Sequence, residues 1–128
     1  MRFMMMVKGD KDYEAGKPPS PALMAAIGKL SEQEARDGIL LESGGLLPSA
    51  AGAKVRVAGG KVTVIDGPFS EAKELVGGYA ILKAASKAEA IEMGKRFMAL
   101  HAEVLGASYE GELEIRQMMD VPPQHGTR

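Results

Sequence analysis

Apolar residues recur every three or four positions near the beginning of the chain, which is the period of an amphipathic helix. Leu23, Ile27 and Leu30 form this stripe, and a Ser-Pro dipeptide stands before it. Such a dipeptide is a typical helix start, since the serine side chain caps free amides and proline fits the first turn. The pattern predicts a helix over Pro21–Asp37, in which Glu34 is one of the polar residues that lie largely off the stripe.

A second helix is predicted from Lys87 to about Leu100. Ser86 and Glu89 stand at the spacing of a capping box, in which the two side chains satisfy free backbone amides. His101 lies on the extension of this helix's apolar seam. A lone histidine there is either a satisfied, partly buried residue or a ligand-binding group, and the sequence leaves both interpretations open.

The remaining apolar runs are short and have the character of strands. Two of them, Val55–Val57 and Val62–Ile65, flank a Gly-Gly turn. Glycine supplies the positive φ that a tight turn requires, so these runs predict a β-hairpin. The other strands are expected at Phe3–Val7, Ile39 to about Leu47, Gly78–Ala84 and Glu112–Met118.

Without the hairpin, the order of elements is βαββαβ, the ferredoxin-like split pattern. We therefore predict a single α+β domain over residues 1–119 and a flexible C-terminal tail over residues 120–128. Two helices cover one face of such a sheet, and the chain has no third predicted helix for the other face. A second copy packed sheet to sheet would bury both open faces, so a homodimer is expected.

Composition narrows the function classes. The formal net charge is -1 and no basic cluster stands out, so a nucleic-acid partner is not expected. The chain has no cysteine, which removes thiolate metal sites and cysteine nucleophiles. No further ligand stands at metal-binding spacing beside the histidines, so neither a metal nor a cofactor is expected. No apolar run has the length of a membrane span, which makes a cytoplasmic location the default expectation.

The most distinctive stretch is Asp66–Glu74, with the sequence Asp-Gly-Pro-Phe-Ser-Glu-Ala-Lys-Glu, and Gly77-Gly78-Tyr79 follows it. This stretch resembles the signature of the YCII-related, or DGPF-domain, proteins. Gly45–Ser49 upstream and Glu112–Arg116 downstream support the resemblance, which covers about Met1 to Met119.

The resemblance implies a YciI-like, dimeric α/β-barrel assembly of the ferredoxin-like class with a cleft near the DGPF loop. It assigns no general reaction. A His–Asp pair suggested as acid–base machinery in the YciI branch does not carry over, because the first helix holds no histidine. Many relatives also have an acid near Gly44 and a histidine near Leu47, and both are absent here. Relatives often accompany extracytoplasmic-function sigma factors, which implies a regulatory alternative.

Three residues are candidates for catalysis. Asp66 is either a turn residue whose carboxylate accepts backbone N–H groups, or a base or ligand anchor at the mouth of a cleft. Tyr79 is either a core residue with a satisfied hydroxyl or a proton donor in the pocket. His101 is the residue best suited to titrate near neutral pH.

Five further residues are candidates for ligand binding. Phe69 either packs against the sheet edge or stacks on a ligand. Glu71 and Lys73 either belong to a solvated charge run or pair across a dimer contact. Arg56 and Arg116 fall on predicted strands, and they would bind an anionic ligand if they face the cleft.

Two function hypotheses follow. In the first, the homodimer binds a small molecule in a cleft near the DGPF loop, with or without weak acid–base catalysis. In the second, the protein is a non-catalytic interaction or sensor module associated with transcription regulation. A concave pocket with converging titratable groups would favour the first hypothesis, and an exposed apolar patch beyond the dimer contact would favour the second.

Overall fold

The structure is a computed structural model that describes residues 1–71 and 75–120. It has the α+β character that the sequence predicts. The elements are β1 (Arg2–Lys8), α1 (Lys11–Glu14), α2 (Pro21–Arg36), β2 (Leu40–Gly45), the 3-10 helix η1 (Ser49–Ala51), β3 (Ala53–Ala58), β4 (Lys61–Asp66), β5 (Val76–Lys83), α3 (Lys87–Leu105) and β6 (Leu113–Gln117).

The main sheet has four strands in the order β2-β5-β1-β6, and each neighbouring pair is antiparallel. With the hairpin set aside, the first and third strands of the chain occupy the centre and the second and fourth form the edges. This order is consistent with the predicted ferredoxin-like fold.

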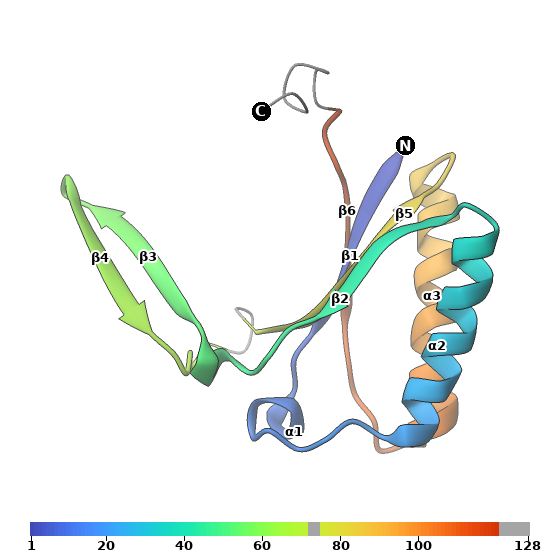
Figure 1. Ribbon diagram of the computed structural model, residues 1–128, viewed down its shortest axis with the longest axis horizontal. Helices are drawn as coiled ribbons and strands as arrows, with labels where there is room; N and C mark the ends of the chain where they lie inside the picture. The colour runs from blue at the N-terminus through green and yellow to red at the C-terminus, as the bar shows by residue number, and fades with distance from the viewer. Residues whose placement is uncertain (72–74, 121–128) are drawn as a thin grey trace.

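Helices α2 and α3 lie side by side against one face of the sheet (Figure 1). Side chains alternate between the two faces of a strand, so Phe3 and Met5 are buried toward the helices while Met4 and Met6 point to the opposite face. Burial of the apolar helix-facing side provides the main stabilisation of the domain. The buried core cluster comprises Phe3, Met5, Leu82, Ala84, Ala90 and Met93.

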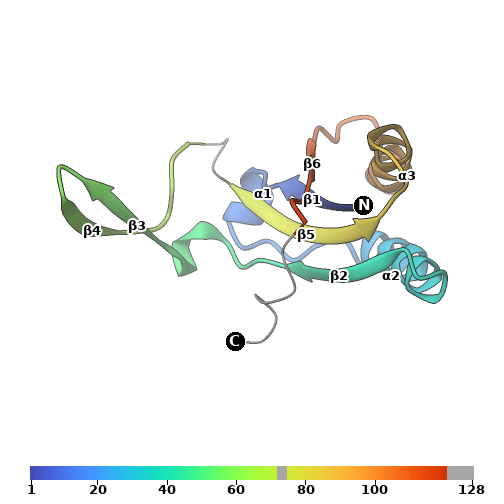
Figure 2. The ribbon, with the colours of Figure 1, turned by 90° about the horizontal axis from the view of Figure 1, so that it is seen from above.

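The predicted hairpin is confirmed, and β3 and β4 form a separate two-stranded sheet. It projects away from the main sheet on the side opposite α2 and α3 (Figures 1 and 2). The turn residues Gly59 and Gly60 have φ values of 58° and 77°. The register places four valines on one hairpin face, and each is 65–71% exposed. They are Val55, Val57, Val62 and Val64.

Both predicted helix starts are confirmed. The Ser20 hydroxyl accepts a hydrogen bond from the amide of Leu23 at 3.3 Å. At the second helix, the Ser86 hydroxyl accepts from the amide of Glu89 at 3.1 Å, and the Glu89 carboxylate accepts from the amide of Ala85 at 3.4 Å. These bonds satisfy amides that the first turn of a helix leaves free.

The structure differs from the prediction at several boundaries. The segment between β1 and α2, for which the sequence predicts neither a helix nor a strand, contains α1, whose first turn is capped by Asp10 through a 2.8 Å hydrogen bond from the Tyr13 amide. A four-residue helix is too short to produce a periodic pattern, which is why the sequence did not indicate it. In addition, β2 ends at Gly45, and α3 continues more than one turn beyond Leu100.

Candidate ligand-binding cavity

A cavity of about 750 Å³ lies between the helix-facing side of the sheet and helices α2 and α3. Leu23 and Ile27 line it from α2, and Met93, Phe97 and His101 line it from α3. Residues four positions apart share one face of a helix, so each helix turns a single face to the cavity. The volume and the mainly apolar wall are those of a small-molecule site.

One end of the cavity is built from segments far apart in the sequence. Tyr13 of α1, Leu46 and Pro48 after β2, and Tyr109 after α3 all line this end. We call it the α1 end. Gly77 lines the cavity beside Tyr13, and a β-carbon built on this glycine would lie 3.7 Å from the tyrosine ring.

The lysines among the lining residues are both paired. The ammonium group of Lys8 lies 3.0 Å from the carboxylate of Glu114, and that of Lys17 lies 3.2 Å from the carboxylate of Asp12. Asp10 and Glu34 also line the cavity, and neither forms an ion pair within the described residues. The charged lining therefore has an excess of carboxylates.

Glu34 is a buried carboxyl group in the cavity wall, with 8% of its surface exposed. Burial raises the pKa of Glu34 above its ordinary value, because the charged form loses its hydration, and the more distant positive charge of Arg96 opposes this rise only in part. Glu34 is thus a group whose neutral form is favoured by the fold.

His101 is also buried in the wall, with 6% exposed. Its Nδ1 lies 3.0 Å from the carbonyl oxygen of Phe97. A carbonyl only accepts hydrogen bonds, so Nδ1 carries the proton and Nε2 of the neutral ring is an acceptor. Two rings flank the imidazole, that of Phe97 at a centroid distance of 4.8 Å and that of Tyr109 at 5.6 Å.

The two tyrosines of the α1 end are perturbed by their surroundings. The Tyr13 hydroxyl is shielded from solvent and has no hydrogen-bond partner within the described residues. Burial, and next the neighbouring Glu14 carboxylate, raise the pKa of Tyr13, and the nearby backbone amide of Leu46, which itself donates to the Gly77 carbonyl at 2.9 Å, opposes this rise in part. Burial, and next the Asp10 carboxylate, raise the pKa of Tyr109. Both hydroxyls are therefore hydrogen-bond donors over the physiological pH range.

The DGPF loop, residues 66–69, is anchored by hydrogen bonds to residues that do not line the cavity. The Ser49 hydroxyl donates to the carboxylate of Glu14 and accepts from the amide of Phe69 at 2.9 Å. The Glu14 carboxylate also accepts from the amide of Ser49 at 2.9 Å. Residues 66–69 do not line the cavity, whereas Pro48, next to Ser49, does. The loop is thus connected to the α1 end through Ser49 and Glu14.

The structure does not bring the three candidate catalytic residues together. Asp66 is exposed at the end of β4. Tyr79 is among the residues that line the cavity, but its register opposite Met6 places its side chain on the other face of the sheet, where its hydroxyl donates to Glu42. His101 is the member of this trio whose side chain is buried beside the cavity.

The candidate binding residues are also dispersed. Arg56 lies on the projecting hairpin, and Arg116 pairs with Glu114 at 3.2 Å. Phe69 is half-buried, and the ammonium group of Lys54 lies 4.7 Å from its ring centroid, within the range of a cation–π contact. Glu71 is exposed. Lys73 and the predicted tail beyond residue 120 lie outside the described residues.

The sequence interpretation missed Glu34, Tyr13 and Tyr109. A signal for Glu34 was present, because it follows Leu30 by four positions and Ile27 by seven, which continues the apolar stripe. Its placement off the stripe was therefore wrong. No comparable signal existed for the two tyrosines, because they stand in short segments between the predicted elements.

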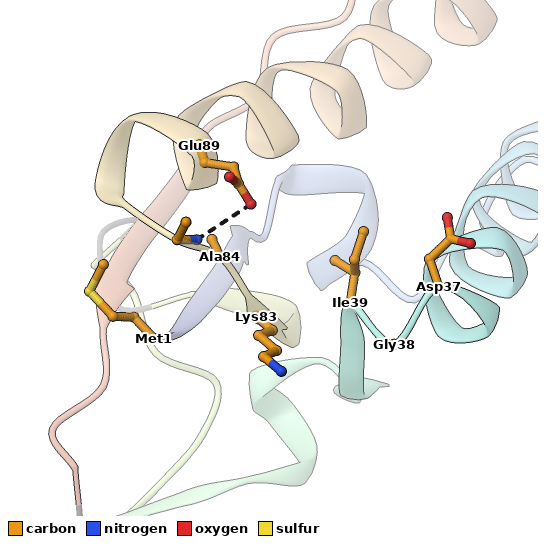
Figure 3. Close-up of a pocket in the computed structure, with 8 residues that line it drawn as sticks. Met1, Asp37, Gly38, Ile39, Lys83, Ala84 and Glu89 are labelled. Atoms are coloured by element: carbon orange, nitrogen blue, oxygen red, sulfur yellow. Dashed lines mark hydrogen bonds between the residues drawn. The ribbon is translucent and has the colours of Figure 1, made fainter.

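A second hollow, of about 420 Å³, lies where the start of α3 meets the ends of α2 and β5 (Figure 3). Asp37, Lys83 and Glu89 are its charged lining residues, and Figure 3 shows their side chains pointing in different directions. The Glu89 carboxylate is engaged in capping α3. This hollow therefore offers no convergent set of polar groups.

Residues 1–71 and 75–120 contain no group of three or more histidine, cysteine, aspartate or glutamate side chains placed to hold a metal ion. Among their helices, none is long and apolar enough to cross a membrane.

The fold and the cavity define an α+β domain with two helices packed on a four-stranded antiparallel sheet and a ligand-sized space between the layers. Residues 1–108 match the YCII-related domain, and the chain belongs to the YCII-related family. The resemblance seen in the sequence is thereby confirmed. No curated protein matches the chain.

Proposed function

We propose that this YCII-related protein binds a small, largely apolar molecule in the cavity between its sheet and helices. The observation that carries the proposal is the 750 Å³ cavity itself, whose mainly apolar wall contains the buried polar groups of Glu34, His101 and Tyr13. Apolar pockets with a few polar groups are typical small-molecule sites.

The test uses Nile red, a neutral apolar dye whose fluorescence rises in a dry environment. Ser31 lines the cavity from α2, so Ser31→Trp would fill part of the space. Gln33 is exposed on the same helix, and Gln33→Trp adds the same side chain outside the cavity. We expect the native protein and Gln33→Trp to bind the dye, and Ser31→Trp to bind it at least about tenfold more weakly.

Equal dye binding by Ser31→Trp and Gln33→Trp would contradict the proposal, because the dye would then occupy another apolar surface. Circular dichroism of both variants provides the control for folding. Absence of dye binding to the native protein would also contradict the proposed binding function.

The arrangement supports binding more directly than catalysis. Acid–base chemistry needs two groups within hydrogen-bond reach of one reacting molecule. Asp66 and Tyr79 lie on other faces of the domain, while His101 has Tyr109 and Phe97 as its neighbours. Weak acid–base catalysis, with Asp66 as base or ligand anchor and Tyr79 or His101 assisting, stays a prediction.

A second candidate function is assembly, which two apolar surfaces favour. The open face of the sheet carries Met4, Met6, Tyr79 and Ile81, and the valine face of the hairpin is largely exposed. An isolated two-stranded hairpin is marginally stable in water, so a covering partner would stabilise it. We take that partner to be a second copy of the chain, packed sheet to sheet.

Light scattering after gel filtration tests the assembly. Ile81→Arg places a charge on the open face of the sheet, and Val62→Lys places one on the valine face of the hairpin. The adjacent Thr63 lies on the opposite hairpin face, so Thr63→Lys is the matched control. We expect the native protein and Thr63→Lys to be dimers and Ile81→Arg to be a monomer. A native monomer at high concentration would refute the assembly.

If Ile81→Arg is a monomer but Val62→Lys is still a dimer, the hairpin does not take part in the contact between the two copies. Its valine face would then be available to another partner, as the interaction-module hypothesis expects. This measurement therefore tests whether the hairpin belongs to the contact between the two copies.

A further inference from the structure

We propose that the molecule bound in the cavity is a neutral, largely apolar compound whose polar group lies at the α1 end, where it accepts a hydrogen bond from Tyr13 and donates one to His101. An apolar alcohol or phenol has this chemistry. The inference rests on the proposed binding function and specifies the class of ligand.

The first argument is the free hydroxyl of Tyr13. Its oxygen is shielded from solvent and has no hydrogen-bond partner within the described residues. Tyr13 is also one of the residues that line the cavity. A buried donor without a partner costs free energy that an acceptor on a ligand would recover. The tyrosine is well anchored, because its amide donates to Asp10 at 2.8 Å and its ring lies beside Gly77.

The second argument is the orientation of His101. The Phe97 carbonyl fixes the proton on Nδ1, which leaves Nε2 as an acceptor with no hydrogen bond to the described residues. The flanking rings of Phe97 and Tyr109 hold the imidazole in place. A ligand therefore complements this residue with a donor, and a hydroxyl is a group that is both donor and acceptor.

The third argument is charge. Lys8 and Lys17 are already paired with carboxylates, and Asp10 adds a further carboxylate to the lining. An anionic ligand would lose its hydration in a mainly apolar wall without gaining a free cation. The same wall disfavours a cation, which would also lose its hydration there. Burial favours the neutral form of Glu34, so this carboxyl group does not offer a cation a charged partner.

The experiment compares four compounds with the same ring system and the same site of substitution: naphthol, methylnaphthalene, naphthoate and naphthylmethylammonium. Dissociation constants are measured by displacement of Nile red at neutral pH. We expect naphthol to bind about threefold to tenfold more tightly than methylnaphthalene, the gain of one or two net hydrogen bonds. Naphthoate and the ammonium compound are expected to bind at least about tenfold more weakly than naphthol.

Two tyrosine variants locate the hydrogen bond. Tyr13→Phe removes the hydroxyl in the cavity and is expected to lower the preference for naphthol over methylnaphthalene to the part that His101 contributes, while leaving methylnaphthalene binding unchanged. Tyr79→Phe is the matched control, because its hydroxyl donates to Glu42 on the other face of the sheet. This control should retain the full preference.

A spectroscopic readout makes the test independent of any variant. Naphthol binding should shift the Nε2 nitrogen resonance of His101, and methylnaphthalene should produce a smaller shift. An unchanged His101 resonance in the presence of saturating naphthol would overturn its assignment as a partner.

The outcomes separate the two proposals. If none of the four compounds displaces the dye and the dye itself does not bind, the proposed function fails and this inference fails with it. If methylnaphthalene equals naphthol, or if a charged compound binds most tightly, binding in the cavity stands and the ligand class proposed here is wrong.

Discussion

A β-carbon built on Gly67 would lie 1.7 Å from the carbonyl oxygen of Ser49. The two backbones meet where the DGPF loop passes the 3-10 helix η1, and the amide of Gly67 donates to the carbonyl of Gly52 at 2.9 Å. No side chain fits between them. The second residue of the motif is therefore fixed by close backbone packing.

Gly67→Ala is expected to destabilise the protein by about 1–3 kcal/mol, because the added methyl group forces two hydrogen-bonded backbone segments apart. Urea denaturation measures the change in the free energy of unfolding. Gly28→Ala is the control, since Gly28 lies within α2 and a β-carbon there meets nothing within 4 Å. That change should stabilise the protein by about 0.5–1 kcal/mol. A destabilisation by Gly28→Ala as large as that by Gly67→Ala would show that space is not the cause.

Ser49→Ala removes the hydroxyl that accepts from the Phe69 amide and donates to Glu14. The expected loss is about 1–3 kcal/mol in the free energy of unfolding, since two partners lose a hydrogen bond. Amide hydrogen exchange at Phe69 should accelerate in the same variant. Ser70→Ala, at an exposed neighbouring position, should change stability by less than about 0.5 kcal/mol. Unchanged exchange at Phe69 would contradict the role given to Ser49.

Glu34→Gln tests the buried carboxyl group through pH. Because burial raises the pKa of Glu34 in the folded state above its ordinary value of 4.5, the folded protein binds the proton more tightly than the unfolded chain. Stability from this group is fully present below about pH 4.5 and is lost as pH rises through the raised pKa. The difference in unfolding free energy, Glu34→Gln minus native, should therefore increase over this window and then become constant.

The exposed Glu32, which pairs with Arg36 at 3.7 Å, is the control for Glu34. Glu32→Gln makes the same substitution at an exposed position of the same helix, so the rise for Glu34→Gln is measured against this variant. A pH-independent difference for Glu34→Gln would mean that this carboxyl group titrates equally in the folded and unfolded states.

All three tyrosines of the chain are expected to titrate above pH 10 in the folded protein. Burial raises the pKa values of Tyr13 and Tyr109, and the hydrogen bond to Glu42 raises that of Tyr79. Ultraviolet absorbance of phenolate formation measures this directly. The free energy of unfolding should decrease as pH rises from about 10 through the raised pKa values, because the unfolded chain releases these protons at a lower pH than the folded protein does. A tyrosine that titrates at 10 in the native protein would contradict its described surroundings.

The DGPF loop illustrates which features of a protein a sequence motif can predict and which it cannot. Its residues identified the family correctly. Asp66 is exposed at the end of β4, and both of its interpretations, as a turn residue and as a base or ligand anchor, stay predictions. The resemblance implied a cleft near this loop, and the cavity is lined by Pro48 and Tyr13, which are connected to the loop through Ser49 and Glu14. These contacts join residues 20 and 35 positions apart, and local spacing does not encode them.

The sequence alone determined the helices, the hairpin and the antiparallel α+β arrangement, because these depend on period, capping residues and turn glycines, which act over a few neighbouring positions. It also placed His101 on the buried seam of its helix. Only the tertiary structure decided which polar groups share the cavity, because Glu34, His101 and Tyr13 come from three separate elements. Their burial depends on how closely α2 and α3 pack on the sheet, and that spacing results from the shapes of all the intervening side chains together.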